Sequence, residues 1–311
     1  MNGAKLKIIK SILFDKYSKK KASSIEEFPK TVLVDTTNYC NLNCSMCARK
    51  FMSRKKGFME ENLYRKIVDE IASVNKNVRL WMNFYGEGLA IKNAGLFNWI
   101  SYAKSKGINK VLINTNGMLL DEECARKLVE CGLDEIHIGI DAFTEETYRK
   151  LRVGGNFVRV VENTKKAIEI VNNSFKKRPK IVIQCVETIE NAGEIKKFID
   201  YWKHFKVSVM IRPKVSWAGA VEADNLVKID RHPCYWLMET CVIGHNGLAF
   251  LCAVDYDGKF VAGDVNHETI KSVWNGKLKE MRILHTKGQY ELLPQICRNC
   301  KDWQASEVKY Y

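Results

Sequence analysis

Short runs of apolar, often β-branched residues alternate with longer amphipathic segments from residue 31 onward, and this alternation constrains the fold most. An apolar period that switches between about 2 and about 3.6 residues predicts strands and helices in turn. The predicted strands cover residues 31–35, 78–84, 109–114, 134–140, 180–187 and 206–212, and the predicted helices cover residues 60–73, 93–106, 121–131, parts of 144–173, and 192–204. Strands that alternate with helices pair in parallel through right-handed crossovers. We therefore expect an α/β fold with a partial barrel of six strand–helix units, since an eight-unit barrel needs about 250 residues.

The alternation stops near Trp217, and the segment that follows has shorter elements and more cysteines. Residues 242–265 have the turn sequences of hairpin strands, and residues 269–284 have a helical pattern. A small, cysteine-rich segment of this kind usually needs a metal to stabilise it. The sequence therefore predicts three regions: a basic amphipathic segment over residues 1–30, the partial barrel over 31–220, and a small hairpin-and-helix metal domain over 221–311.

Composition narrows the class of protein. Hydrophobic residues make up 46% of the 311 residues, which excludes a disordered chain. No apolar run approaches the roughly 18 to 20 residues of a membrane span, so we expect no transmembrane segment. Lysines interrupt the first apolar stretch, which is not typical of a signal peptide, so we expect a cytoplasmic protein. Eleven cysteines without a secretion signal favour metal or redox chemistry over disulfides. The net charge of +14 suits an acidic partner, but no nucleic-acid-binding module is visible, and no nucleic acid is expected.

The first cysteine cluster follows the first predicted strand directly. Cys40, Cys44 and Cys47 have the spacing C-x3-C-x2-C, and no further cysteine or histidine occurs within residues 48–60. Three thiolates on one loop can bind three irons of a cubane cluster and leave the fourth iron open to a substrate or cofactor. Zinc remains an alternative, although a structural zinc site normally has a fourth ligand nearby.

Residues 40–47, CNLNCSMC, resemble the signature of the radical S-adenosylmethionine (SAM) enzymes, and four further motifs occur in the family's order. The segment Phe84–Leu89 resembles the GGEP motif, with Tyr85 and Gly88 in place of the first glycine and the proline. Asn114–Gly117 resembles the family's TNG motif. Gly139–Asp141 resembles the S-x-D motif, with a glycine where serine is common. Tyr148–Arg152 resembles a family segment that ends in a ligand-binding arginine. This resemblance implies a 4Fe-4S cluster held by Cys40, Cys44 and Cys47, with SAM contacts at Gly86, Glu87, Asn116, Asp141 and Arg152.

The second cluster comprises Cys234, Cys252, Cys297 and Cys300. Four thiolates saturate an iron–sulfur cluster, and zinc would accept the same set. The spacing resembles the C-terminal SPASM/twitch extension of radical SAM enzymes, without the later C-x5-C-x3-C series of the full extension. The resemblance therefore implies one auxiliary 4Fe-4S cluster. Cys241, in the same segment, could replace Cys234 as a ligand.

The resemblance implies an oxidoreductase with the architecture of the 2-deoxy-scyllo-inosamine dehydrogenase type. Such an enzyme cleaves SAM reductively to a 5′-deoxyadenosyl radical and oxidises a small hydroxylated substrate, while the auxiliary cluster accepts an electron. A reductant such as flavodoxin or ferredoxin would be its partner. Two alternatives stay open: a peptide-modifying radical SAM enzyme that forms thioether or carbon–carbon bonds, and a non-enzymatic metal-bearing protein that binds nucleic acid. Because only about 30 residues precede the first strand, we expect no leader-peptide-binding domain there. No catalytic base can be assigned from sequence.

Overall fold

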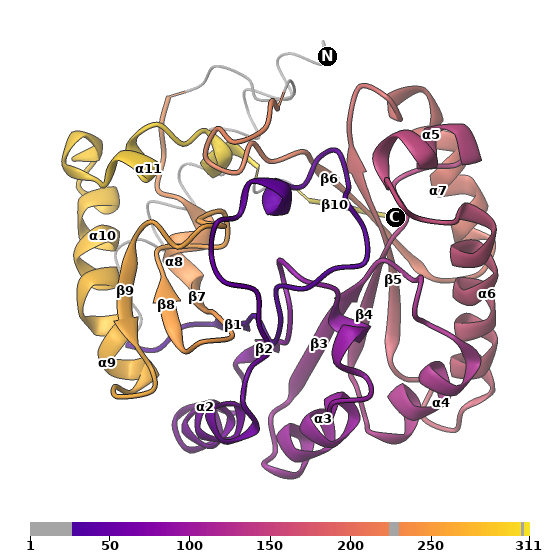
Figure 1. Ribbon diagram of the computed structural model, residues 1–311, viewed down its shortest axis with the longest axis horizontal. Coiled ribbons are helices and arrows are strands. Elements are labelled where there is room, and N and C mark those ends of the chain that lie inside the picture. The colour runs from indigo at the N-terminus through magenta and orange to yellow at the C-terminus, as the bar shows by residue number, and fades with distance from the viewer. Residues whose placement is uncertain (1–26, 224–229, 306–307) are drawn as a thin grey trace.

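The computed structural model describes residues 27–223, 230–305 and 308–311 (Figure 1). The amphipathic segment expected over residues 1–30 lies outside the described residues, apart from residues 27–30. In the described part of the chain, no helix combines the length and the apolar character that crossing a membrane requires.

The predicted alternation of strands and helices is confirmed in its order. The six barrel strands are β1 (Thr31–Val34), β2 (Arg79–Trp81), β3 (Lys110–Thr115), β4 (Glu135–Gly139), β5 (Lys180–Glu187) and β6 (Ser208–Pro213). The helices are α2 (Glu61–Val74), α3 (Leu96–Ser105), α4 (Glu122–Glu130), α5 (Glu145–Leu151), α6 (Phe157–Asn173) and α7 (Ile195–Lys203). Each barrel strand pairs in parallel with the next, and Figure 1 shows the helices along the outside of this open barrel.

Two expected elements differ in the structure. The strand expected over residues 78–84 ends at Trp81, because Asn83 turns to bond the Asn114 backbone and begins a loop. The single helix expected over residues 269–284 is two helices, α9 (Ile270–Asn275) and α10 (Lys277–Thr286). Gly276 separates them because its ψ of −127° is not helical.

The C-terminal segment continues the barrel sheet instead of forming a separate one. β7 (Thr240–Ile243) pairs in parallel with β1, and β8 (Leu248–Phe250) and β9 (Val261–Asp264) follow in antiparallel order. At the other edge, β10 (Lys309–Tyr310) pairs antiparallel with β6, so the mixed sheet has the order β10-β6-β5-β4-β3-β2-β1-β7-β8-β9. Because β7 lies beside β1, the second cysteine segment comes close to the first cysteine loop.

The remaining short elements lie in loops. They are α8 (Tyr235–Glu239), α11 (Gln295–Arg298), and the 3-10 helices η1 (Ala48–Phe51), η2 (Gly88–Ile91), η3 (Ala192–Glu194), η4 (Tyr290–Leu292) and η5 (Asp302–Gln304).

The barrel strands bury both faces. The outer face carries residues such as Val32, Leu80 and Val111, which belong to one core cluster with the helices. Leu33, Trp81 and Leu112 belong to a second cluster, together with residues of β7 and β8. Because side chains alternate along a strand, this second cluster marks the inner face of the barrel.

Candidate functional site

The loop that follows β1 gathers the first three thiols. Cys40, Cys44 and Cys47 lie in one small cluster with Leu42, Met46, Leu151 and Met118. Backbone hydrogen bonds hold this loop against the end of α5 and the turn after it, since the N–H of Asn43 donates to the Val153 carbonyl and the N–H of Ser45 to the Leu151 carbonyl, each at 2.9 Å. The chain therefore presents three thiols at the carboxyl end of β1, where barrel sites lie.

Each of these sulfurs has an N–H donor directed at it. Cys40 Sγ accepts from Asn116 Nδ2 at 3.9 Å, Cys44 Sγ from Arg152 Nη1 at 3.7 Å, and Cys47 Sγ from the backbone of Arg49 at 3.5 Å. Burial raises the pKa of the Cys40 thiol to about 11 and also raises the pKa of Cys47. Thiols in this setting need a bound cation to become thiolates near neutral pH, and N–H donors then stabilise the sulfur charge. This donor set fits an iron–sulfur cluster.

Gly86 and Glu87 lie beside this loop. A β-carbon on Gly86 would overlap the carbonyl oxygen of Thr37, so this close approach requires glycine. The Glu87 backbone donates to the Tyr39 carbonyl at 2.7 Å. Its buried carboxylate accepts from the backbone of Leu89 at 3.0 Å and from Thr115 Oγ1 at 2.6 Å. Burial raises the pKa of the Glu87 carboxyl group, and the hydrogen bonds from Thr115, Asn116 and Leu89 oppose this rise.

Asn116 connects the loops after β1, β2 and β3. Its backbone N–H donates to Glu87 Oε2 at 2.8 Å, and its Nδ2 donates to Asn41 Oδ1 at 2.8 Å. The three strand-end motifs that the sequence singled out thus form one hydrogen-bonded unit around Cys40.

Asp141 and Arg152 complete the set on the side of Cys44. Asp141 has a φ of 64°, a conformation that is strained for a residue with a β-carbon. Its Oδ1 accepts from the Val186 backbone at 2.8 Å, and its carbonyl accepts from Asn191 Nδ2 at 2.7 Å. Arg152 forms an ion pair with Asp141 through Nε and Nη2, each 2.6 Å from Oδ2. All five residues predicted to contact SAM therefore lie together at the three-thiol loop.

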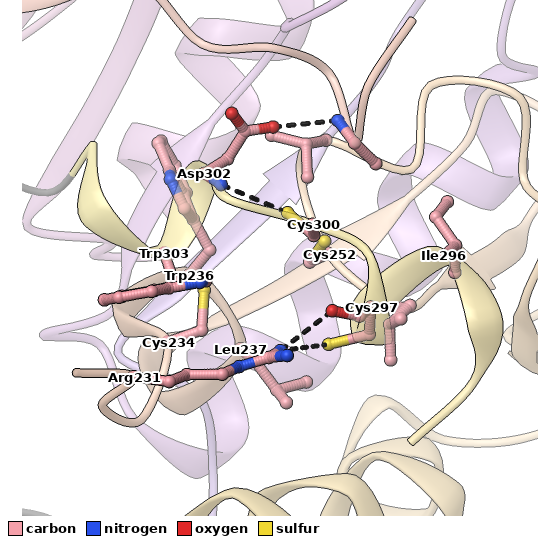
Figure 2. Close-up of a pocket in the computed structure, with 13 residues that line it drawn as sticks. Arg231, Cys234, Trp236, Leu237, Cys252, Ile296, Cys297, Cys300, Asp302 and Trp303 are labelled. Carbon is pink, nitrogen blue, oxygen red and sulfur yellow. Dashed lines mark hydrogen bonds between the residues drawn. The ribbon is translucent and has the colours of Figure 1, made fainter. Parts of the chain in front are cut away.

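The other four thiols line one pocket, shown in Figure 2. Cys234 precedes α8, Cys252 follows β8, Cys297 lies in α11 and Cys300 follows it. The pocket encloses about 420 Å³, part of it open to solvent, with an otherwise mostly apolar lining. Cys241 does not line this pocket but lies in β7, buried in the barrel core and opposite Val32. This arrangement favours Cys234 over Cys241 as the fourth thiol.

Two cationic or polar side chains that the sequence did not indicate contact Cys297. Arg231 Nη2 donates to Cys297 Sγ at 3.6 Å, and His285 Nε2 lies 3.2 Å from the same sulfur. Burial, with Arg231 and His232 adding to it, lowers the pKa of His285 to about 3. His285 lies on α10, and no ligand-like spacing in the sequence connects it with Cys297.

The four-thiol pocket also fits an iron–sulfur cluster chemically. Burial raises the pKa of Cys297 to about 12, and the N–H of Asp302 donates to Cys300 Sγ at 3.3 Å. Among the described residues, no group of three or more His, Cys, Asp and Glu side chains is arranged to bind one metal ion. A thiol-only set with N–H donors is the donor chemistry of a cluster.

Polar atoms without hydrogen-bond partners in the described chain occupy the inner face of the barrel. They are Trp81 Nε1, Asn114 Oδ1, His137 Nδ1 and Gln184 Oε1. The register places Asn114 beside His137 and Gly139 beside Gln184, so these side chains share one face. His137 and Gln184 are 5% and 9% exposed, so their unpaired atoms are costly unless a ligand satisfies them.

Aromatic rings lie between the two thiol sets. Trp217 Nε1 donates to the carbonyl of Met46, in the three-thiol loop, at 2.9 Å. The Trp217 ring packs against Phe84 at 5.6 Å between centroids, and Phe84 packs against Trp236 at 5.8 Å. Trp236 lines the four-thiol pocket, so a continuous aromatic contact connects the two sites.

Comparison with protein families agrees with this geometry. The model of the radical SAM superfamily matches residues 34–199, and the model of the SPASM iron–sulfur cluster-binding domain matches residues 234–301. The first match begins at the end of β1 and covers more than half of the chain, and the second contains all four pocket thiols.

Individual relatives match over most of the chain. The tungsten-containing aldehyde ferredoxin oxidoreductase cofactor-modifying protein of Pyrococcus furiosus is 25% identical over 269 residues, covering 84% of this chain and 73% of the relative. The S-adenosyl-L-methionine-dependent 2-deoxy-scyllo-inosamine dehydrogenase of Niallia circulans is 22% identical over 285 residues, covering 89% of this chain and 95% of the relative. The crystal structure of Streptococcus suis SuiB bound to its precursor peptide SuiA has a TM-score of 0.67 at 14% identity, covering 92% of this chain and 72% of that one, and shares the fold.

Proposed function

The chain belongs to the radical SAM superfamily and carries a C-terminal SPASM domain, and from this premise we propose that it oxidises a small hydroxylated molecule. It is a radical SAM enzyme with a 4Fe-4S cluster that works with SAM, and its SPASM domain implies auxiliary iron–sulfur chemistry. The observation that carries the proposal is that a three-thiol loop and a four-thiol pocket occur together with a polar inner face of the barrel.

The two thiol sets have different proposed roles. Cys40, Cys44 and Cys47 would hold a cluster with one iron left open, whereas the four pocket thiols would leave no iron open. When bound, the first cluster with SAM would supply a 5′-deoxyadenosyl radical for hydrogen abstraction, and the auxiliary cluster would supply an acceptor for the remaining electron. The relationship to a 2-deoxy-scyllo-inosamine dehydrogenase supports this assignment.

The SAM-contacting residues are proposed from their place beside the open loop. Gly86 lets the backbone approach closely, and Glu87 holds the loops after β2 and β3 together, because its carboxylate accepts from both. Arg152 and Asp141 present a fixed ion pair next to Cys44. Asn116 links Cys40 with the β3 loop.

The inner face supplies the proposed substrate contacts. A hydroxyl group both donates and accepts hydrogen bonds. Asn114 Oδ1 and Gln184 Oε1 would accept from substrate hydroxyls, and Trp81 Nε1 would donate to one. Partners of this kind suit a polyhydroxylated or amino-substituted molecule.

His137 is the proposed proton acceptor. Its Nε2 bonds Glu135 Oε1 at 2.5 Å, which places the ring proton on Nε2 and leaves Nδ1 with a lone pair. Nδ1 has no partner in the described chain, and the ring lies 5.9 Å from Trp81 between centroids. A buried carboxylate–imidazole pair with one open nitrogen can accept the proton that an oxidised alcohol loses.

A second candidate is peptide modification by the same chemistry. SuiB, which shares the fold, was crystallised with its precursor peptide, and this relationship supports the alternative. A short precursor peptide encoded beside this gene would favour it. For either substrate class, we propose an acidic flavodoxin or ferredoxin as reductant, since the chain carries a net charge of +14.

Anaerobic iron and sulfide analysis with EPR tests the cluster assignment. Wild type should hold about eight irons and the Cys40/Cys44/Cys47→Ala variant about four, with a SAM-sensitive signal lost in the variant. About four irons in wild type and none in the variant would remove the electron acceptor and with it the dehydrogenase proposal. Zinc without any response to SAM would contradict both clusters.

Substrate screening follows with the reduced enzyme, SAM, and a panel of amino sugars and polyols. The proposal expects one 5′-deoxyadenosine per oxidised product. Recovery of unchanged SAM after many turnovers would favour an isomerase or epimerase instead. Product formed only with a peptide would favour the second candidate.

A further inference from the structure

We propose that Arg231 and His285 raise the reduction potential of the auxiliary cluster by donating hydrogen bonds to the Cys297 sulfur. This inference rests on the proposed ligation of that cluster by Cys234, Cys252, Cys297 and Cys300. It assigns two positioning residues outside the thiol set, and Figure 2 shows Arg231 directed at Cys297.

His285 connects two of the four thiol-bearing residues. Its Nδ1 accepts from the backbone N–H of Cys234 at 3.4 Å, and its Nε2 lies 3.2 Å from Cys297 Sγ. A ring nitrogen that accepts at Nδ1 leaves the ring proton on Nε2, so Nε2–H is the donor to sulfur. The side chain is fully buried, and its ring packs against Tyr290 at 5.6 Å, which fixes the orientation of the donor.

Arg231 adds a fixed positive charge at the same sulfur. Its guanidinium donates to the carbonyl oxygens of Cys297 at 2.8 Å and Arg298 at 3.0 Å, and it lies 4.6 Å from the centre of the Tyr290 ring. No carboxylate of the described residues forms an ion pair with it. The charge of Arg231 acts on the Cys297 sulfur, whereas the buried Asp302 carboxylate, which lines the same pocket, acts in the opposite direction on Cys300.

Hydrogen bonds to cluster sulfurs tune the reduction potential because the reduced cluster carries one more negative charge than the oxidised cluster. A donor stabilises the more negative state more strongly, so it makes reduction easier. The backbone N–H of Asp302 acts in the same direction on Cys300, but the negative charge of the Asp302 carboxylate opposes it there. The donors at Cys297 thus favour added electron density at that sulfur, as the proposed electron acceptor requires.

An EPR-monitored redox titration tests the inference in the Cys40/Cys44/Cys47→Ala background, where only the auxiliary cluster contributes. His285→Leu, which has similar bulk but no donor, should lower the one-electron equilibrium constant for reduction about tenfold, or 59 mV. Arg231→Gln should also lower this equilibrium constant. His285→Gln, which keeps an N–H donor, should retain most of the wild-type potential. His267→Leu, a change at an exposed histidine, should have no effect.

An unchanged potential in both His285→Leu and Arg231→Gln, with about four irons retained, would overturn the inference. If the His285→Leu variant loses its iron, the Arg231→Gln variant provides the test. A lower reduction potential in Arg231→Gln supports the inference, and an unchanged potential overturns it. A potential shift in a protein that oxidises no hydroxylated substrate would contradict the proposed reaction alone. Absence of iron from the background variant would instead contradict the auxiliary cluster and this inference together.

Discussion

The guanidinium of Arg152 occupies the space that a β-carbon on Gly139 would need, so an added methyl group would overlap Nη2. The overlap explains why this position holds a glycine. Arg152 passes over Gly139 to reach Asp141 and Cys44. The glycine and the ion pair are therefore parts of one arrangement.

We expect Gly139→Ala to weaken SAM binding about tenfold, because the new methyl group displaces Arg152 and breaks one charged hydrogen bond to Asp141. Calorimetric titration of the anaerobic holoenzyme with SAM measures the effect. Gly193→Ala is the matched control, since a β-carbon there meets no atom within 4 Å. Equal SAM affinity in Gly139→Ala and wild type would contradict this role for the Arg152–Asp141 pair.

The barrel could be predicted from the sequence because the pattern of each strand and helix lies within one short stretch of the chain. Strands such as β5 were expected with the same bounds, residues 180–187, since apolar runs bounded by turn residues do not depend on distant partners. The three-thiol loop was equally readable, because Cys40, Cys44 and Cys47 lie within eight residues of each other. When all the residues of a site lie in one short segment, their spacing in the sequence is sufficient to predict the site.

The contacts that depend on tertiary packing could not be predicted in this way. His285 reaches Cys297 only because α10 packs beside the loop of α11, and the break at Gly276 sets the start of α10. The inner-face groups Asn114, His137 and Gln184 become visible as a set only when strand register is known. The pairing of β7 with β1 is equally non-local and brings the two thiol sets together.

Cys234 and Cys241 should respond oppositely to substitution. Cys234→Ala should remove up to about four irons, because it deletes a thiol that lines the pocket. Cys241→Ala should keep about eight irons and lose about 1 kcal/mol of unfolding free energy, since it deletes a buried sulfur from the barrel core. Iron analysis and thermal unfolding of both variants measure this contrast. Loss of iron in Cys241→Ala alone would reverse the assignment.

His137→Gln should uncouple SAM cleavage from substrate oxidation. The variant keeps a polar side chain at the inner face but lacks the imidazole base, so product formation should fall at least a hundredfold. Formation of 5′-deoxyadenosine should continue, because the hydrogen bond and the ring contact of His137 are with Glu135 and Trp81 and not with the three-thiol loop. His204→Gln, which changes an exposed histidine, is the control. The ratio of product to 5′-deoxyadenosine is the measurement, and an unchanged ratio would remove His137 from the chemistry.

Asp35 should make stability depend on pH. Burial raises the pKa of its carboxyl from 3.8 to about 6, although Arg54 lies 3.8 Å away and opposes the shift. The folded state therefore binds this proton more tightly than the unfolded state, and stability is lost as the pH rises from about 4 to about 6.

Asp35→Asn removes this ionisation, so its unfolding free energy should gain about 1–2 kcal/mol relative to wild type between pH 5 and pH 7. Denaturant unfolding of both anaerobic proteins at pH 5 and at pH 7 gives the difference in unfolding free energy between Asp35→Asn and wild type at each pH. The prediction concerns how this difference changes from pH 5 to pH 7, so an effect of the amide beside Arg54 that is the same at both pH values cancels. Asp230→Asn, at an exposed position, controls for the loss of one charge. Parallel pH profiles for wild type and Asp35→Asn would show that Asp35 keeps the same proton affinity in the folded and unfolded states.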